Sequence, residues 1–126
     1  DRTILLDMLA WTPTERFLDA MGASLDGPEA EGKSFKVNLV ITDAKESYVL
    51  WIENSVLHHR RAPPAADADA TLELSKRLFL GMMTGSVKLK DLLLGDELKT
   101  SGSRLDLVRF FALFDKATGT FPIVTP

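Results

Sequence analysis

Both histidines of this chain lie in one short run, His58-His59-Arg60-Arg61. Imidazole rings can bind metal ions or transfer protons, so this run is the first candidate for chemistry. Its spacing argues against both roles, because neighbouring residues of a strand point to opposite faces of the sheet. No carboxylate lies close by in sequence to orient either ring. We expect a solvated or edge-strand pair, with no catalytic or metal-binding role.

A second candidate is the acidic alternation of Asp67, Asp69 and Glu73. Carboxylates at such spacing could suggest a calcium-binding loop. The run lacks the central Gly and the terminal Glu of the 12-residue calcium motif. We therefore expect a loop that leads into a strand, with Asp side chains bonded to local backbone.

The other motifs of enzyme and nucleotide sites are missing from the sequence. No serine lies in a Gly-x-Ser-x-Gly elbow, and there is no phosphate-binding or dinucleotide glycine pattern. The lack of cysteine excludes disulfides and thiolate metal sites. A net charge of −3 provides no basic surface for nucleic acid. No apolar run approaches the ~20 residues that span a bilayer. We predict no catalytic residue, metal site, cofactor or transmembrane segment in this chain.

What remains is an excess of apolar side chains on the predicted helices near the C-terminus. Methionines suit adaptable apolar surfaces, and the last helix is apolar around most of its circumference. One interpretation is an apolar pocket for an alkyl chain. The alternative is an ordinary core together with an interface to another domain. The candidate pocket residues are Phe79, Met82, Met83, Leu93, Phe110, Phe111 and Phe114.

The elements that would position these residues follow from hydrophobic periodicity. Alternating patterns predict strands at 35–42, 48–53, 56–61, 70–74 and 98–101. Asn54-Ser55 is predicted to be a two-residue hairpin turn. Helices are predicted from Pro13 to Leu25, after Ser75, over 88–94 and from Arg104 to about Lys116, with Thr12, Ser75 and Ser103 as caps. A run of strands followed by helices favours an α+β fold, with one mostly antiparallel sheet and helices on a face.

Four separated segments also carry a family resemblance. They are 25–33 (LDGPEAEGK), 53–57 (ENSVL), 66–72 (ADADATL) and 121–126 (FPIVTP). In this order they resemble the C-terminal domain of bacterial-type alkyl sulfatases, from about Trp11 to Pro126. The resemblance implies a fold like that of sterol carrier protein 2, with a five-stranded sheet covered by helices.

The resemblance also implies a function. The chain would be a non-catalytic, lipid-binding module that holds the alkyl chain of sulfate esters, with a long-chain alkyl or fatty-acyl group as ligand. Cleavage and zinc would belong to an upstream metallo-β-lactamase-like domain of the same protein. The chain alone would not be an enzyme. The compartments of the family favour a periplasmic or secreted location.

Two alternatives remain open: a purely structural or interaction domain without a ligand cavity, and a free-standing lipid carrier. The length of 126 residues fits one domain. The chain begins Asp1-Arg2-Thr3, without a signal peptide or an initiating Met, so we expect a fragment or a processed product. Residues 1–11 would form a short helix that links to a domain further upstream.

Overall fold

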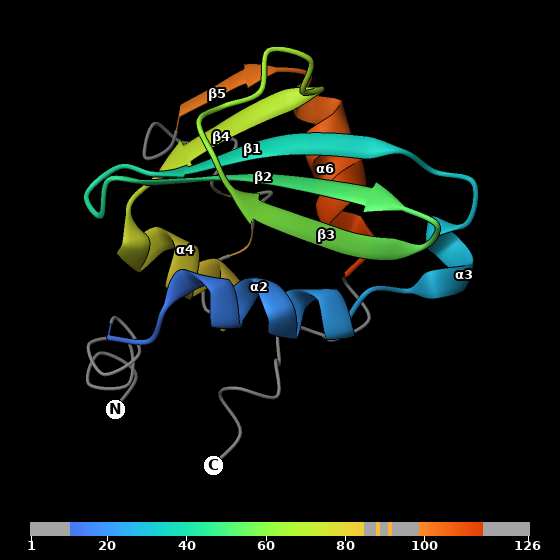
Figure 1. Ribbon diagram of the computed structural model, residues 1–126, viewed down its shortest axis with the longest axis horizontal. Coiled ribbons are helices and arrows are strands. Elements are labelled where there is room, and N and C mark those ends of the chain that lie inside the picture. Colours follow the sequence, from blue (N-terminus) through green and yellow to red (C-terminus); the bar gives the residue numbers. More distant parts are fainter. Residues whose placement is uncertain (1–10, 85–87, 89–90, 92–98, 115–126) are drawn as a thin grey trace.

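Five strands with period-two patterning form one sheet at the centre of the computed structural model, which describes residues 11–84, 88, 91 and 99–114. The strands are β1 (Phe35–Ile41), β2 (Glu46–Glu53), β3 (Val56–Arg61), β4 (Ala70–Leu74) and β5 (Lys99–Gly102). Their spatial order is β3-β2-β1-β4-β5. Only the β1–β4 pair is parallel, and the other three pairs are antiparallel. The predicted mostly antiparallel sheet is confirmed (Figure 1).

The tight turn between β2 and β3 fixes the register of this hairpin. Asn54 and Ser55 have φ angles of 55° and 61°, as a two-residue hairpin turn requires. Trp51 is thereby placed opposite His58, and Leu50 opposite His59.

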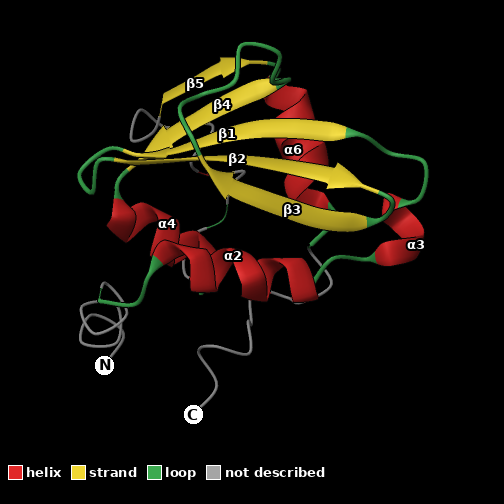
Figure 2. Ribbon diagram, in the orientation of Figure 1, coloured by secondary structure: helices red, strands yellow, loops and turns green. Residues whose placement is uncertain are grey.

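The described helices pack on one face of the sheet, as Figure 2 shows for α2 and α4. They are α2 (Thr14–Ala23), α3 (Gly27–Ala30), α4 (Lys76–Met83) and α6 (Arg104–Ala112). Side chains of α2, α4 and α6 share one hydrophobic core with alternate strand residues such as Leu39, Leu50 and Leu72. The predicted caps of α4 and α6 are confirmed: the hydroxyls of Ser75 and Ser103 each accept a backbone N–H three residues later.

The opposite face of the sheet has no described helix over it. The loop of residues 62–69 crosses this face on its way from β3 to β4. Asn38 and Val49 point to this side and are only 2% exposed. Hydrogen bonds between Asn38 and Ala65 hold the loop against the sheet. The second face is therefore covered in part by a loop, and the residues beyond it line an open groove.

Two details differ from the sequence prediction. Thr12 was expected to cap the first main helix, but Pro13 holds the N-cap position and no side chain caps it. The Thr14 hydroxyl instead donates to Glu46. The last helix ends at Ala112 and not near Lys116. The predictions for 1–10, for most of 88–94 and for 115–126 lie outside the described residues.

Candidate functional site

The predicted pocket residues that the structure describes pack in a single cluster between the sheet and its helices. Phe79, Met83, Phe110 and Phe114 are buried core residues, while Met82 and Phe111 are half-buried against that core. The Phe110 ring packs edge-on against Phe111, with centroids 5.1 Å apart, and against Phe35 of β1 at 6.2 Å. Leu93 lies outside the described residues. These rings mainly fill the space between the helices and the sheet.

A pocket opens beside this cluster, between α3 and the C-terminal end of α6. We call it the α3–α6 pocket, and its volume is about 630 Å³. It is lined by Asp26, Glu29, Lys33, Ser34, Phe35, Arg109, Ala112 and Leu113. Phe35, Ala112 and Leu113 provide apolar surface, Lys33 and Arg109 supply cationic groups, and Asp26 and Glu29 supply carboxylates. Phe35 also contacts Phe110, so the pocket adjoins the predicted aromatic cluster.

Backbone hydrogen bonds hold the two walls of the α3–α6 pocket together. The N–H of Asp26 donates to the carbonyl oxygen of Leu113 at 2.9 Å, which joins the start of α3 to the end of α6. The Asp26 carboxylate caps α3 by accepting the N–H of Glu29 at 3.2 Å. Lys33 lies 3.9 Å from Glu29 in an exposed ion pair, which leaves its ammonium largely available to solvent or a ligand.

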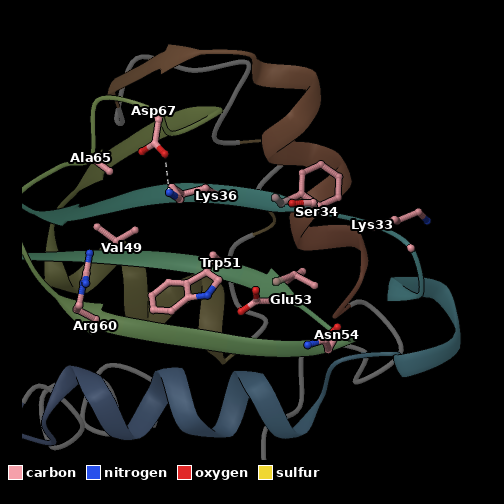
Figure 3. A pocket seen from close by; sticks show the side chains of 13 residues that line it. Lys33, Ser34, Lys36, Val49, Trp51, Glu53, Asn54, Arg60, Ala65 and Asp67 are labelled. Carbon is pink, nitrogen blue, oxygen red and sulfur yellow. Dashed lines mark hydrogen bonds and ion pairs between the residues drawn. The ribbon is translucent and has the colours of Figure 1, made fainter.

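A second pocket, of about 640 Å³, lies on the sheet face opposite the helices. We call it the open-face pocket (Figure 3). Trp51 lies in its middle, with Val49 and Arg60 towards one end and Glu53 towards the other. Ala65 and Asp67 of the crossing loop form one wall, and residues 32–36 line it as well.

The two histidines point to opposite faces of the sheet, as their adjacency on a strand predicts. The His58 ring stacks on Trp51, with centroids 5.3 Å apart and an interplanar angle of 13°. His59 faces the helices, where its Nε2 lies 2.7 Å from Asp19 Oδ1. This carboxylate comes from α2, so the sequence neighbourhood of His59 could not reveal it. Neither ring shares a site with the other.

Two residues of the acidic alternation, Asp67 and Asp69, bind the end of the crossing loop to β1. Asp69 Oδ2 accepts the backbone N–H of Lys36 at 2.9 Å, and Asp67 Oδ2 lies 2.7 Å from the Lys36 ammonium. The expectation of bonds to local backbone holds in part, since the Asp67 carboxylate also bonds its own backbone. The partners on β1, however, lie more than thirty residues away. The Lys36 ammonium lowers the pKa of Asp67. Glu73 points to the open face from β4, in register with Lys99 of β5.

A polar cluster that the sequence did not suggest ties the N-termini of α2 and α4 to β2. Glu46 Oε1 accepts hydrogen bonds from the hydroxyls of Thr14 (2.6 Å) and Tyr48 (2.9 Å), and Lys76 Nζ donates to Thr14 Oγ1 at 2.7 Å. Arg61 lies 3.7 Å from the second oxygen of Glu46.

The electrostatics of this cluster favour an ionised Glu46. Burial raises the pKa of Glu46, but the hydrogen bonds from Thr14 and Tyr48, with the charges of Lys76 and Arg61, outweigh burial and lower it overall. Burial and the neighbouring carboxylate raise the pKa of Tyr48. Burial lowers the pKa of Lys76, although nearby carboxylates oppose the shift. The groups satisfy one another, which fits a structural role.

Residues 11–84, 88, 91 and 99–114 contain neither a metal-binding cluster nor a membrane-spanning helix. No group of three or more His, Asp or Glu side chains there is placed to hold a metal ion. No helix within the same ranges is long and apolar enough to cross a bilayer.

Known proteins share this architecture. Sterol carrier protein 2 superposes with a TM-score of 0.59 at 13% identity, over 82% of this chain and 91% of that chain. The sec-alkylsulfatase Pisa1 from Pseudomonas sp. superposes with a TM-score of 0.74 at 27% identity, over 80% of this chain and 16% of that chain. The fold is thus that of the sterol carrier proteins, as predicted.

Sequence comparison identifies the family. The alkyl sulfatase C-terminal family matches residues 2–126, and the chain belongs to it. A linear primary-alkylsulfatase from Pseudomonas sp. is 33% identical over 110 residues, which are 87% of this chain and 16% of that protein. The alkyl/aryl-sulfatase BDS1 of Saccharomyces cerevisiae is 30% identical over 112 residues, 89% of this chain and 17% of that protein. The chain therefore spans about a sixth of the length of the relatives it matches.

Proposed function

We propose that this chain is the lipid-binding accessory module of an alkyl sulfatase. It would hold the alkyl chain of a sulfate ester while a separate, upstream zinc hydrolase domain of the metallo-β-lactamase type cleaves the ester. Membership of the alkyl sulfatase C-terminal family and the sterol carrier fold support this role. The alkyl-sulfatase relatives supply the substrate class.

The observation that carries the proposal is the α3–α6 pocket. Its inner surface offers Phe35, Ala112 and Leu113, and Lys33 and Arg109 line the same space. An alkyl sulfate has the matching chemistry, with an apolar tail and an anionic head. A mostly apolar pocket with a few placed polar groups is the usual form of a small-molecule site.

The alkyl chain would continue from this pocket towards the predicted aromatic cluster. Phe35 lines the pocket and contacts Phe110, and Phe111 of the same helix is only half-buried. Insertion there would displace core contacts of α6. We propose that the deeper part of the site is lined by the residues predicted from the sequence: Phe79, Met82, Met83, Leu93, Phe110, Phe111 and Phe114. Each buried methylene contributes about 0.8 kcal/mol before the costs of association.

Calorimetric titration with octyl, decyl and dodecyl sulfate, each below its micelle threshold, tests the proposal. We expect saturable binding that strengthens with chain length, because the buried apolar area grows. The matched alcohols should bind more weakly, because Lys33 and Arg109 then have no anion to contact. No saturable binding of any chain length would overturn the proposal.

Variants on one helix locate the site. Ala112→Asp introduces a carboxylate at an exposed position that lines the α3–α6 pocket, and it should weaken decyl sulfate binding by about tenfold or more. Val108→Asp is the matched control, because Val108 lies on the same helix, is 42% exposed and does not line the pocket. Equal loss in both variants would contradict this location.

A solid structural domain is the second candidate, and one observation favours it. Phe79 and Phe110, expected to line a cavity, are 2% and 0% exposed within the core. The same titration separates the two functions, because a structural domain binds none of the alkyl sulfates saturably.

A further inference from the structure

The sheet face opposite the helices carries a site with a different chemistry. We propose that the open-face pocket binds a flat aromatic monoanion, such as an aryl carboxylate, aryl sulfonate or aryl sulfate. This inference does not rest on the alkyl-binding function, because the residues that carry it lie on the other face of the sheet. They are Trp51, His58 and Arg60, with Glu53 and the crossing loop as boundaries.

An aromatic platform is already built into this face. The His58 ring stacks almost parallel on Trp51, at an interplanar angle of 13°. Trp51 lines the pocket and His58 does not. Part of the indole surface is therefore left for the pocket, and a ligand ring placed there would extend the existing stack. Offset stacking of aromatic rings is favourable beyond the apolar area that it buries.

A cationic side chain beside the indole favours a ligand with a negative charge. The Arg60 guanidinium carbon lies 5.9 Å from the Trp51 ring centroid, and the Arg60 side chain is exposed. Lys33 and Lys36 also line the pocket. The Lys36 ammonium is engaged by Asp67 at 2.7 Å, and the Lys33 ammonium lies 3.9 Å from Glu29 of α3. A carboxylate or sulfonate on a stacked ring can accept two parallel hydrogen bonds from Arg60.

At the other end of the groove, the Glu53 carboxylate limits the ligand to one negative charge. Glu53 follows Trp51 by two residues on the same strand, so both side chains emerge on this face. Figure 3 shows Glu53 on the side of Trp51 away from Arg60. A second anionic group on the ligand would meet this carboxylate. The arrangement favours a single anion directed towards Arg60.

The wall of the pocket is fixed before any ligand binds. Ala65 and Asp67 belong to the crossing loop, and each is bonded to β1, through Asn38 and Lys36 respectively. A wall held in this way loses little freedom on binding, which improves the affinity for a small ligand.

Titration with 4-nitrobenzenesulfonate, followed by calorimetry, tests the inference. Methanesulfonate has the same anionic group without a ring, and without an alkyl chain for the α3–α6 pocket, so it serves as the ligand control. We expect saturable binding of the aryl sulfonate and at least about tenfold weaker binding of the aliphatic one, since stacking on Trp51 is then lost. Arg60→Gln should weaken aryl sulfonate binding by about tenfold, because a charged hydrogen bond is removed.

Two further variants complete the design. Trp51→Leu should abolish aryl binding, and circular dichroism reports whether it folds. Because Arg60 is exposed, Arg60→Gln should still fold, and it tests the inference even if Trp51→Leu does not fold. Arg16→Gln is the matched control, since Arg16 is an exposed arginine on α2, in the helical layer. Equal affinity for the two sulfonates, or equal loss in Arg60→Gln and Arg16→Gln, would overturn the inference. Weaker aryl binding in Ala112→Asp would place the ligand in the α3–α6 pocket and would also overturn it.

Discussion

Asn38 and Ala65 exchange two hydrogen bonds, although they lie 27 residues apart in the chain. The Asn38 amide donates to the Ala65 carbonyl oxygen at 3.0 Å, and its own oxygen accepts the Ala65 N–H at 2.8 Å. A third bond runs from the same amide to Thr71 Oγ1 at 3.0 Å. One buried side chain thus provides backbone-like pairing for a loop that has no strand beside it.

Asn38→Ala should lower the free energy of unfolding by about 2–3 kcal/mol, because it removes the three hydrogen bonds of a buried side chain and leaves the N–H and C=O of half-buried Ala65 without these partners. Thr71→Val is the control, since it removes one acceptor only and should cost less than about 1 kcal/mol. Urea titration measures both values. Equal small losses would show that the loop is held by other contacts.

Gly102 is predicted to be irreplaceable, whereas Gly27 is not. Gly102 has a φ of +78°, and a Cβ there would lie 2.5 Å from the carbonyl oxygen of Asp69 and 2.9 Å from the Cα of Ala70. Backbone atoms cannot move aside easily, so Gly102→Ala should destabilise the domain by about 2 kcal/mol or more. A Cβ on Gly27 meets nothing within 4 Å, so Gly27→Ala is the control. Thermal unfolding should show a lower midpoint in the first variant only.

The Glu46 cluster predicts a pH dependence of stability. The folded-state pKa of Glu46 is lower than its ordinary value of 4.5, so its ionised form stabilises the folded state. This contribution is fully present above about pH 4.5 and is lost as the pH falls through the lowered folded-state pKa. Stability should therefore decline in that acidic window.

Glu46→Gln isolates this contribution. At pH 7 the variant should be less stable by about 1–2 kcal/mol, because Lys76 and Arg61 lose a charged partner. The difference between wild type and variant should shrink as the pH falls below about 4.5. Denaturant titrations at pH 7, 5, 4 and 3 provide the measurement. A difference that does not change with pH would assign the loss to packing and not to charge.

Most of the fold could be predicted because its strands alternate clearly. The pattern at 35–42 predicted the strand that the structure has at Phe35–Ile41, the pattern at 70–74 matches β4, and the structure confirms the Asn54-Ser55 hairpin turn. Serine caps fixed the starts of α4 and α6 in the same local way. These features depend on residues a few positions apart, which sequence patterns describe well.

The candidate sites were harder to predict because they depend on distant residues. Arg109 and Lys33 line the same pocket because the start of α3 bonds to the end of α6. Trp51 lines the open-face pocket because the crossing loop covers only part of the second face of the sheet, which the local pattern of 48–53 does not reveal. Aromatic residues at helical spacing identified the core correctly but could not distinguish packed rings from the lining of a cavity.

The composition of β3 has a consequence for self-association. This strand ends the sheet, so its outer edge has no described partner, and such edges can pair with the same strand of another copy. Arg60 and Arg61 are both exposed, and each carries a positive charge. Two copies that paired through this edge would bring four guanidinium groups together. The basic run of His58 to Arg61, first considered for catalysis, therefore protects the molecule against aggregation through this edge strand.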